Sequence, residues 1–325
     1  MSYFWLDKHL KEWQSAIAGD RKPQAVIING PQGLGKQQLV SAIVNDLLCR
    51  QSTESPCGQC QNCLLLAGGH HPDVIRVAPE KNVIKVDMIR EVTVFFTSTP
   101  HCSDYKLACL TAAETMNVSA ANALLKVLEE PPGRGVLFLL TDNKHQLMPT
   151  IRSRCISLDV HVNQQEQQPV LAWLSEQSES DPQAVAEAWV ICDGQPLTTL
   201  AYLEAAKTGT FTQYLDLLLA ALAGQTAVTQ VAKSMAEQLN INDWVMLQRY
   251  CLQLAKSELS PQVTEVCQGH PLSQLIKKSP KVINTVIKIA DLIQQFVLNL
   301  NTQIKTQLLL ESYLIEIKTE LIDGR

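Results

Sequence analysis

The stretch that decides the fold runs from Ala25 to Gln37 and reads AVIINGPQGLGKQ. It opens with an apolar run that predicts a buried strand, and the residues after Gln37, up to Leu48, carry apolar side chains at helical spacing. In between, Gly30 to Gln37 has the pattern of a phosphate-binding loop, in which backbone N–H groups and a lysine surround phosphate oxygens at the start of a helix. We therefore predict an α/β P-loop domain. Its candidate nucleotide-binding residues are Gly30, Gly33, Gly35 and Lys36.

The last position of this loop departs from the usual pattern. A Ser or Thr normally follows the lysine because its hydroxyl ligates Mg²⁺, and here Gln37 stands in its place. The motif therefore indicates nucleotide-binding ancestry together with impaired metal chemistry. Whether ATP and Mg²⁺ bind at this loop stays open at the level of the sequence.

Length and composition limit the classes of protein to consider. The chain has 325 residues, which suggests two or three domains, and its 46% hydrophobic and 18% charged residues are typical of a globular protein. A formal net charge of -5 argues against a broad electrostatic footprint on nucleic acid, so protein partners are expected. There is no run of eighteen apolar residues and no signal-peptide pattern, so we expect no membrane segment and a cytoplasmic location.

Short apolar runs alternate with helical stretches in the first half of the chain, residues 1–162. That alternation predicts a parallel sheet covered by helices, with ligands at the carboxyl ends of the strands. The predicted strands are Ala25 to Asn29, Val74 to Ala78, Lys106 to Leu110, Val136 to Leu140 and Ile156 to Leu158.

After His161 the strand signals stop and helical patterns follow. We expect a small helical domain at residues 163–207 and a helix bundle at residues 208–325. The predicted helices are Pro169 to Glu176, Pro182 to Ile191, Pro196 to Lys207, Tyr214 to Leu222, Trp244 to Leu254, Val282 to Leu300 and Gln307 to Ile317.

A cysteine cluster follows the helix of the phosphate loop. Cys57, Cys60 and Cys63 stand at three-residue intervals, and Cys49 lies eight residues before Cys57. In a chain without an export signal such spacing favours metal binding over disulfides, and Cys-x-x-Cys turns suit a tetrahedral Zn²⁺. We predict that these four residues hold a structural zinc ion in an insertion at about residues 49–71.

Two alternatives to this zinc site remain at the level of the sequence. The thiols could be ordinary buried cysteines, and His70 or His71 could replace Cys49 as the fourth ligand. Four sulfur ligands would leave no open coordination position, so the metal would hold the insertion together and would not activate water.

A metal-dependent ATPase of this type also needs an Asp at the end of a second apolar strand, often followed by a catalytic Glu. The best-placed strand, Tyr105 to Leu110, continues instead into Thr111-Ala112-Ala113. Glu114 comes too late for the pattern and is expected to be a solvated or capping residue at the start of the next helix. A rival assignment uses Asp142, which follows the apolar run Val136 to Thr141, but no catalytic acid follows it.

Two further segments carry a family resemblance. Asn122 to Pro132 reads NALLKVLEEPP, an apolar-faced helix ended by two prolines, and Thr150 to Cys155 reads TIRSRC. At this separation the two motifs resemble the clamp-loader branch of the AAA+ ATPases. The cysteine insertion, the missing acidic pair and the helical last third narrow the resemblance to the delta-prime family of bacterial DNA polymerase III. It covers the whole chain, strongly from about residue 24 to 160.

The resemblance implies a subunit of a ring-shaped clamp loader whose ATP sites lie between neighbouring subunits. It implies that Arg154 is an arginine finger acting in trans on a tau or gamma subunit, and that Thr141 occupies a position that senses the γ-phosphate. The second sensing arginine is missing near Gly194-Gln195-Pro196, so no intrinsic ATPase activity is expected. For Arg154 the alternative is an ordinary loop arginine in a surface ion pair.

The resemblance also implies partners and the roles of the helical domains. Residues 163–207 would be a lid and residues 208–325 a collar for assembly with tau or gamma and delta subunits, and the ring would load the beta sliding clamp on primed DNA. Two rival functions remain. One is an ATP-hydrolysing subunit, with Lys36 on the phosphates and Asp142 or Glu114 serving the metal. The other is a zinc-stapled nucleic-acid-binding module, against which the acidic charge balance argues.

Overall fold

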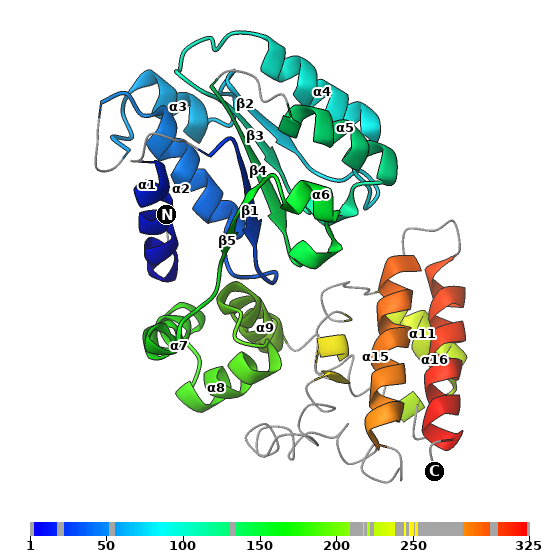
Figure 1. Ribbon diagram of the computed structural model, residues 1–325. Helices are drawn as coiled ribbons and strands as arrows, with labels where there is room; N and C mark the ends of the chain where they lie inside the picture. The colour runs from blue at the N-terminus through cyan, green and yellow to red at the C-terminus, as the bar shows by residue number, and fades with distance from the viewer. Residues whose placement is uncertain are drawn as a thin grey trace. The chain divides into compact units, whose positions relative to one another are not determined.

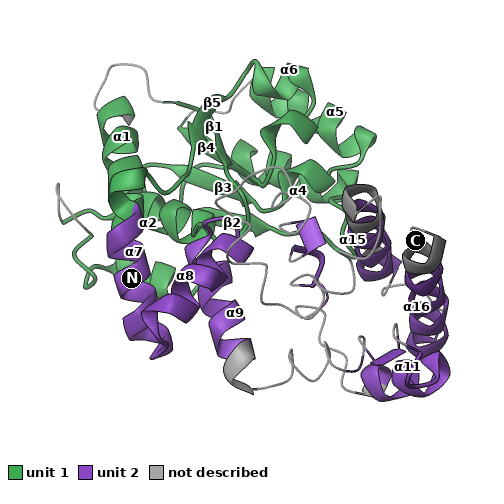
Figure 2. Cartoon of the chain, turned by 90° about the horizontal axis from the view of Figure 1, so that it is seen from below, with its two compact units in different colours: residues 1–166 green, residues 167–325 purple. Residues whose placement is uncertain are grey.

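The computed structural model describes residues 3–17, 23–51, 56–129, 134–208, 217, 220–221, 224–237, 244, 247–249, 251–252, 282–299 and 305–323. The chain divides into two compact units, Met1–Glu166 and Gln167–Arg325, shown in green and purple in Figure 2. Each unit has its own hydrophobic core.

The first unit is built on a parallel sheet of five strands in the order β2-β3-β4-β1-β5. The strands are β1 (Ala25–Asn29), β2 (Val74–Val77), β3 (Lys106–Leu110), β4 (Gly135–Thr141) and β5 (Ile156–Asp159). The predicted parallel α/β sheet is therefore confirmed, and each strand ends within one residue of its predicted limits. The phosphate-loop strand β1 lies between β4 and β5.

Helices cover both faces of this sheet (Figure 1). One face carries α1 (Asp7–Ile17) and α2 (Lys36–Leu48), with the short α3 (Gln61–Ala67) packed beside α2. The other face carries α4 (Val86–Thr97) and α5 (Val118–Glu129), followed in the chain by α6 (Pro149–Arg152). The central strands β3 and β4 are buried at every residue, which explains why they read as continuous apolar runs.

Neighbouring residues of a strand point to opposite faces of the sheet. Leu137 and Leu139 of β4 belong to the core cluster that contains residues of α4 and α5. Phe138, between them, packs on Trp13 of α1 with ring centroids 5.5 Å apart. The sheet therefore has two buried faces, and the segments that leave its strand ends carry the candidate site residues.

The second unit contains most of α7 (Gln164–Ser178) and the helices α8 (Pro182–Ile191), α9 (Pro196–Thr208), α11 (Val228–Glu237), α15 (Val282–Asn299) and α16 (Thr306–Asp323). Its core includes Trp244 and Phe296, whose ring centroids are 4.6 Å apart. Of the predicted helix Tyr214 to Leu222 the structure describes residues 217, 220 and 221, and of Trp244 to Leu254 it describes residues 244, 247–249 and 251–252; these residues are helical. None of the described helices combines the length and the apolar character needed to span a bilayer.

The start of α7 differs from its prediction. The expected helix begins at Pro169, whereas α7 begins at Gln164 and contains that proline. The cause is a local hydrogen bond at the helix start, in which the backbone N–H of Asn163 donates to the Glu166 carboxylate at 2.8 Å. Pro169 is the sixth residue of α7, so it cannot donate the intrahelical hydrogen bond to the carbonyl of Gln165.

Candidate functional site

The candidate residues lie at two opposite edges of the sheet. We call the carboxyl edge the side where the strands end; it carries the phosphate loop, Glu114, Thr141 and Asp142. The amino edge is the side where the strands begin, and Arg154 lies there, two residues before β5. All five strands run in the same direction, so every strand begins at the amino edge and ends at the carboxyl edge.

The phosphate loop connects β1 to α2 with the backbone that its glycines predict. Gly33 and Gly35 have φ angles of 87° and 89°, a conformation that other residues rarely adopt. At Gly30 a Cβ atom would lie 2.6 Å from the carbonyl oxygen of Val160. The indole N–H of Trp5 donates to the carbonyl of Leu34 at 3.0 Å, which ties the N-terminal turn to the loop.

Lys36, the phosphate-binding lysine of the motif, is engaged within the chain. Its ammonium group donates to the carbonyl of Gly30, to the carbonyl of Pro31 at 3.1 Å and to a carboxylate oxygen of Asp142 at 2.5 Å. The side chain of Lys36 is 10% exposed, and that of Asp142 is 51% exposed. The loop lysine therefore forms an ion pair with the residue that follows β4.

Glu114 does not cap α5, and its solvation, the other expected role, is only partial. It lies in a short 3-10 turn, Ala113–Thr115, and its carboxylate accepts from the backbone N–H of Asp142 at 3.4 Å. Its other carboxylate oxygen is buried and has no hydrogen-bond partner among the described residues. Helix α5 is capped by Asn117, which accepts from the N–H of Ala120 at 2.8 Å. Of the two acidic candidates of the rival ATPase assignment, Asp142 thus contacts Lys36, and Glu114 contacts the backbone of Asp142.

Thr111 and Thr141 also end strands at this edge. The Thr111 hydroxyl donates to the carbonyl of Val77 in the neighbouring strand at 3.1 Å, which turns it toward β2. Thr141, the predicted phosphate-sensing residue, is 1% exposed and pairs with Asn29 in the register of β1 and β4. Its carbonyl accepts from the N–H of Gly30 at 3.2 Å, so Thr141 borders the phosphate loop directly.

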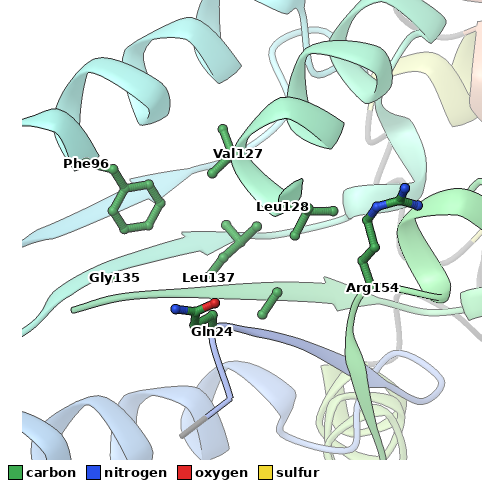
Figure 3. A pocket seen from close by; sticks show the side chains of 8 residues that line it. Gln24, Phe96, Val127, Leu128, Gly135, Leu137 and Arg154 are labelled. Atoms are coloured by element: carbon green, nitrogen blue, oxygen red, sulfur yellow. The ribbon is translucent and has the colours of Figure 1, made fainter. Parts of the chain in front are cut away.

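Arg154 lies at the amino edge in an ion pair. Its guanidinium donates to the Glu129 carboxylate at 2.9 Å and to the carbonyl of Thr150 at 2.9 Å, and its side chain is 37% exposed. It lines the rim of a small pocket whose walls include Phe96, Leu128 and Leu137 (Figure 3). Both the finger role and the surface ion pair that was its alternative are compatible with this placement.

A strand of five residues is roughly 15 Å long. Arg154 precedes β5, and the phosphate loop follows β1, which pairs with β5 in parallel. The guanidinium is held by α5, on the side away from the loop. Arg154 and Lys36 therefore cannot meet on one phosphate group within this chain.

The four cysteines of the insertion come together. Their sulfur atoms all lie within 4.8 Å of one another, and those of Cys57 and Cys63 are 3.9 Å apart. A tetrahedral Zn²⁺ with bonds of about 2.3 Å sets its sulfur ligands about 3.8 Å apart. Backbone N–H groups of Cys57 and Cys60 donate to the sulfurs of Cys49 and Cys57, each at 3.3 Å, as expected for groups that carry negative charge. The donor set therefore fits zinc.

The cysteine thiols of the cluster differ in pKa. The N–H groups of Cys63 and Arg50 lower the pKa of Cys60 to about 6, whereas burial raises the pKa of Cys63 to about 12. A bound cation would remove this difference, because all four ligands would then be thiolates.

The rival histidine ligands lie elsewhere. His70 is exposed, and His71 belongs to a second group formed with Asp73 and Cys102. His71 Nδ1 accepts from the N–H of Asp73 at 3.1 Å, which assigns its proton to Nε2, 3.7 Å from the Cys102 sulfur. Burial lowers the pKa of His71, consistent with a neutral ring.

Asp73 is the centre of this second group, and no sequence motif marks it. Its carboxylate accepts from the backbone N–H groups of His101, Cys102 and Ser103 at 2.6, 2.9 and 3.0 Å and from the Ser103 hydroxyl at 2.8 Å. Burial alone would raise the pKa of Asp73, but these hydrogen bonds lower it to about 2. With its lone pairs occupied in this way, Asp73 fixes the loop before β3 and is a poor metal ligand.

The family described as "DNA polymerase III, delta subunit" matches residues 5–164. "DNA polymerase III subunit delta'" of Pseudomonas aeruginosa is 38% identical over 201 residues, which are 57% of this chain and 59% of the relative. Its counterpart in Escherichia coli is 35% identical over 205 residues, 62% of this chain and 61% of the relative. The chain thus spans about three fifths of the length of these relatives.

Similarity to solved structures extends over more of the chain but is weak. A gamma subunit-related protein of DNA polymerase III from Thermotoga maritima has a TM-score of 0.47 at 17% identity, covering 96% of this chain and 99% of the other. The Bacillus subtilis clamp loader delta protein has a TM-score of 0.37 at 12% identity with the same coverage. The relatives confirm the resemblance that the sequence motifs indicated: residues 5–164 match the model of this family, and the chain is similar to delta-prime subunits of DNA polymerase III.

Proposed function

We propose that this chain is a non-hydrolysing delta-prime subunit of a clamp loader and that it supplies Arg154 in trans to the ATP site of a neighbouring tau or gamma subunit. The observation that carries this proposal is the position of Arg154 at the amino edge, across the sheet from the chain's own phosphate loop. A phosphate that this guanidinium contacts has to belong to another chain.

The environment of Arg154 suits such a role. Its ion pair with Glu129 is partly exposed, and pairs of this kind contribute at most about 1 kcal/mol, so the guanidinium can exchange the carboxylate for a phosphate at small cost. The planar, permanently charged guanidinium binds phosphate oxygens in pairs, and arginine fingers accelerate phosphoryl transfer by about 10³ to 10⁵. Until then Glu129 would hold the side chain in place.

The same proposal accounts for the carboxyl edge. Gln37 supplies no hydroxyl for Mg²⁺, and the hydroxyl of Thr111 is bound to the neighbouring strand. Neither position offers the metal ligand that hydrolysis needs. We therefore place ATP hydrolysis in the neighbouring subunit.

The remaining parts of the proposal concern the assembly. Residues 163–207 would form the lid and residues 208–325 the collar through which the chain joins tau or gamma and delta subunits in the cytoplasm. The complex would then open the beta sliding clamp and place it on primed DNA. Zinc on Cys49, Cys57, Cys60 and Cys63 would stabilise the insertion and take no part in hydrolysis.

The test uses the reconstituted clamp loader. Arg154→Ala should leave the chain folded and slow single-turnover ATP hydrolysis at the adjacent site by on the order of 10³, with slower clamp loading. Arg152→Ala is the matched control, since Arg152 lies on the same turn and contacts His145 at 3.2 Å. Equal hydrolysis rates for the two variants and the wild type would reject the finger role.

A second candidate function is ATP hydrolysis by this chain itself. It is favoured by one observation, that Asp142 contacts Lys36 and Glu114 contacts the backbone N–H of Asp142. Their carboxylates would then hold Mg²⁺ in place of the missing ligands. This candidate requires that the purified chain hydrolyse ATP and that Lys36→Ala abolish the activity; a chain without such activity excludes it.

A further inference from the structure

The ammonium group of Lys36 is fully used within the chain. An ammonium has three N–H donors, and the carbonyls of Gly30 and Pro31 and the carboxylate of Asp142 accept one each. The two carbonyls belong to the loop itself and are neutral. The only negative partner of Lys36 among the described residues is Asp142.

We propose that Asp142 acts as an internal substitute for phosphate and keeps the phosphate loop of this chain closed to nucleotide. The carboxylate reaches Lys36 because β4 and β1 are parallel neighbours, so that Asp142, directly after β4, and Gly30, directly after β1, lie side by side. It takes the place that a phosphate oxygen takes in a loaded P-loop, as an anion on the lysine.

Glu114 strengthens this effect. Its carboxylate is held against the backbone N–H of Asp142, which places a second acidic group beside the loop. An incoming phosphate must displace Asp142 from the lysine and approach two carboxylates of its own sign. Removing the charge of Asp142 therefore weakens its hydrogen bond with Lys36 and lowers the repulsion at once.

This inference concerns the carboxyl edge and does not depend on the proposed role of Arg154. It attributes the low affinity for nucleotide that we expect of this loop to the contact between Asp142 and Lys36, in addition to the metal ligands that the sequence lacks. A consequence is that the loop adopts the same closed form whether or not ATP is present in solution.

The experiment measures binding of ATP to the purified full-length chain by calorimetry, with no added divalent cation and without a chelator that would strip metal from the cysteines. The central variant is Asp142→Asn, which keeps the shape and removes the charge. Asp159→Asn is the matched control: Asp159 is the last residue of β5 at this edge, its side chain is also 51% exposed, and it pairs with Lys144 at 2.7 Å instead of Lys36. Melting curves check that each variant is folded, and Asp142→Ser replaces Asp142→Asn if the latter is not.

Asp142→Asn should bind ATP about tenfold more tightly than the wild type, the effect of one charge-assisted hydrogen bond, and Asp159→Asn should change the affinity less than about threefold. Adding Lys36→Ala to Asp142→Asn should cancel the gain. The proposal is wrong if Asp142→Asn binds no more tightly than Asp159→Asn, or if neither binds detectably. It is equally wrong if added Mg²⁺ makes the wild type bind better than Asp142→Asn, since Asp142 would then be a metal ligand.

Discussion

The two edges of the sheet differ in how their charges are used. At the carboxyl edge Lys36 is nearly buried and neutralised by Asp142, so the groups that would handle a nucleotide contact each other. At the amino edge Arg154 keeps more than a third of its side chain exposed and is held by one acidic neighbour in a surface pair. Under the two proposals, the edge that a P-loop ATPase uses for its own ligand would be closed, and the opposite edge would offer a cation to another molecule. The predictions below test this contrast.

The largest effect is expected at the amino edge. Arg154→Lys keeps the positive charge but loses the planar fork that binds two phosphate oxygens together. In the reconstituted complex we expect single-turnover hydrolysis at the adjacent site to fall by about two to three orders of magnitude, close to the effect of Arg154→Ala. If lysine restored most of the wild-type rate, a point charge would suffice and the bidentate role would be wrong.

The cysteine cluster tests whether the insertion depends on metal. Purified chain should contain about one zinc per molecule by atomic emission, and Cys60→Ser should lose the metal together with about 4 kcal/mol of unfolding free energy. Cys109→Ser is the control, because Cys109 is a buried cysteine of β3 outside the cluster. A chain that is equally stable with and without zinc would contradict the structural role.

Asp73 should make part of the stability depend on pH. Its folded pKa of about 2 lies below its ordinary value of 3.8, so its contribution is complete above pH 4 and is lost as the pH falls toward 2. The shift corresponds to about 2 kcal/mol. Denaturant titrations should show that Asp73→Asn is less stable than the wild type by about this amount at pH 6 and that the gap narrows below pH 4. A gap independent of pH would mean that the ionised carboxylate is not what anchors the loop.

The smallest effect is expected at Glu129. Glu129→Gln removes the partner of Arg154, and an exposed ion pair of this kind contributes less than about 1 kcal/mol. Thermal melting should therefore be nearly unchanged, whereas the reconstituted complex reports whether Glu129 also positions the guanidinium. A loss of several kcal/mol would show that the pair is structural, and the contrast between the two edges would weaken.

Much of the first unit follows from local sequence. The strands are predictable because β3 and β4 are buried on both faces and so appear as unbroken apolar runs. The loop is predictable because its glycines and lysine all lie between Gly30 and Lys36. The clustering of the four cysteines is predictable because only a few residues separate them in the sequence. The predicted start of α7 is wrong because a proline is typical of a helix start, whereas the hydrogen bond between Asn163 and Glu166 begins this helix before Pro169.

The contacts of the carboxyl edge were not predictable in the same way. Lys36 and Asp142 are 106 positions apart, and Glu114 reaches Asp142 only because the chain turns sharply after β3, with Ala112 at a φ of 50°. Left-handed backbone at an alanine has no signature in the sequence. The pairing of ionic groups at strand ends depends on such turns, and only the fold reveals it.

Gly30 is needed for the packing of the backbone around the phosphate loop. A side chain at this position would collide with the carbonyl of Val160, a main-chain atom that cannot move aside easily. A glycine is required because two adjacent chain segments lie close together, and this would be true even if no ligand bound to the loop. The glycine at this position of the degenerate motif is therefore explained by backbone packing. Its presence does not indicate whether the protein binds ATP.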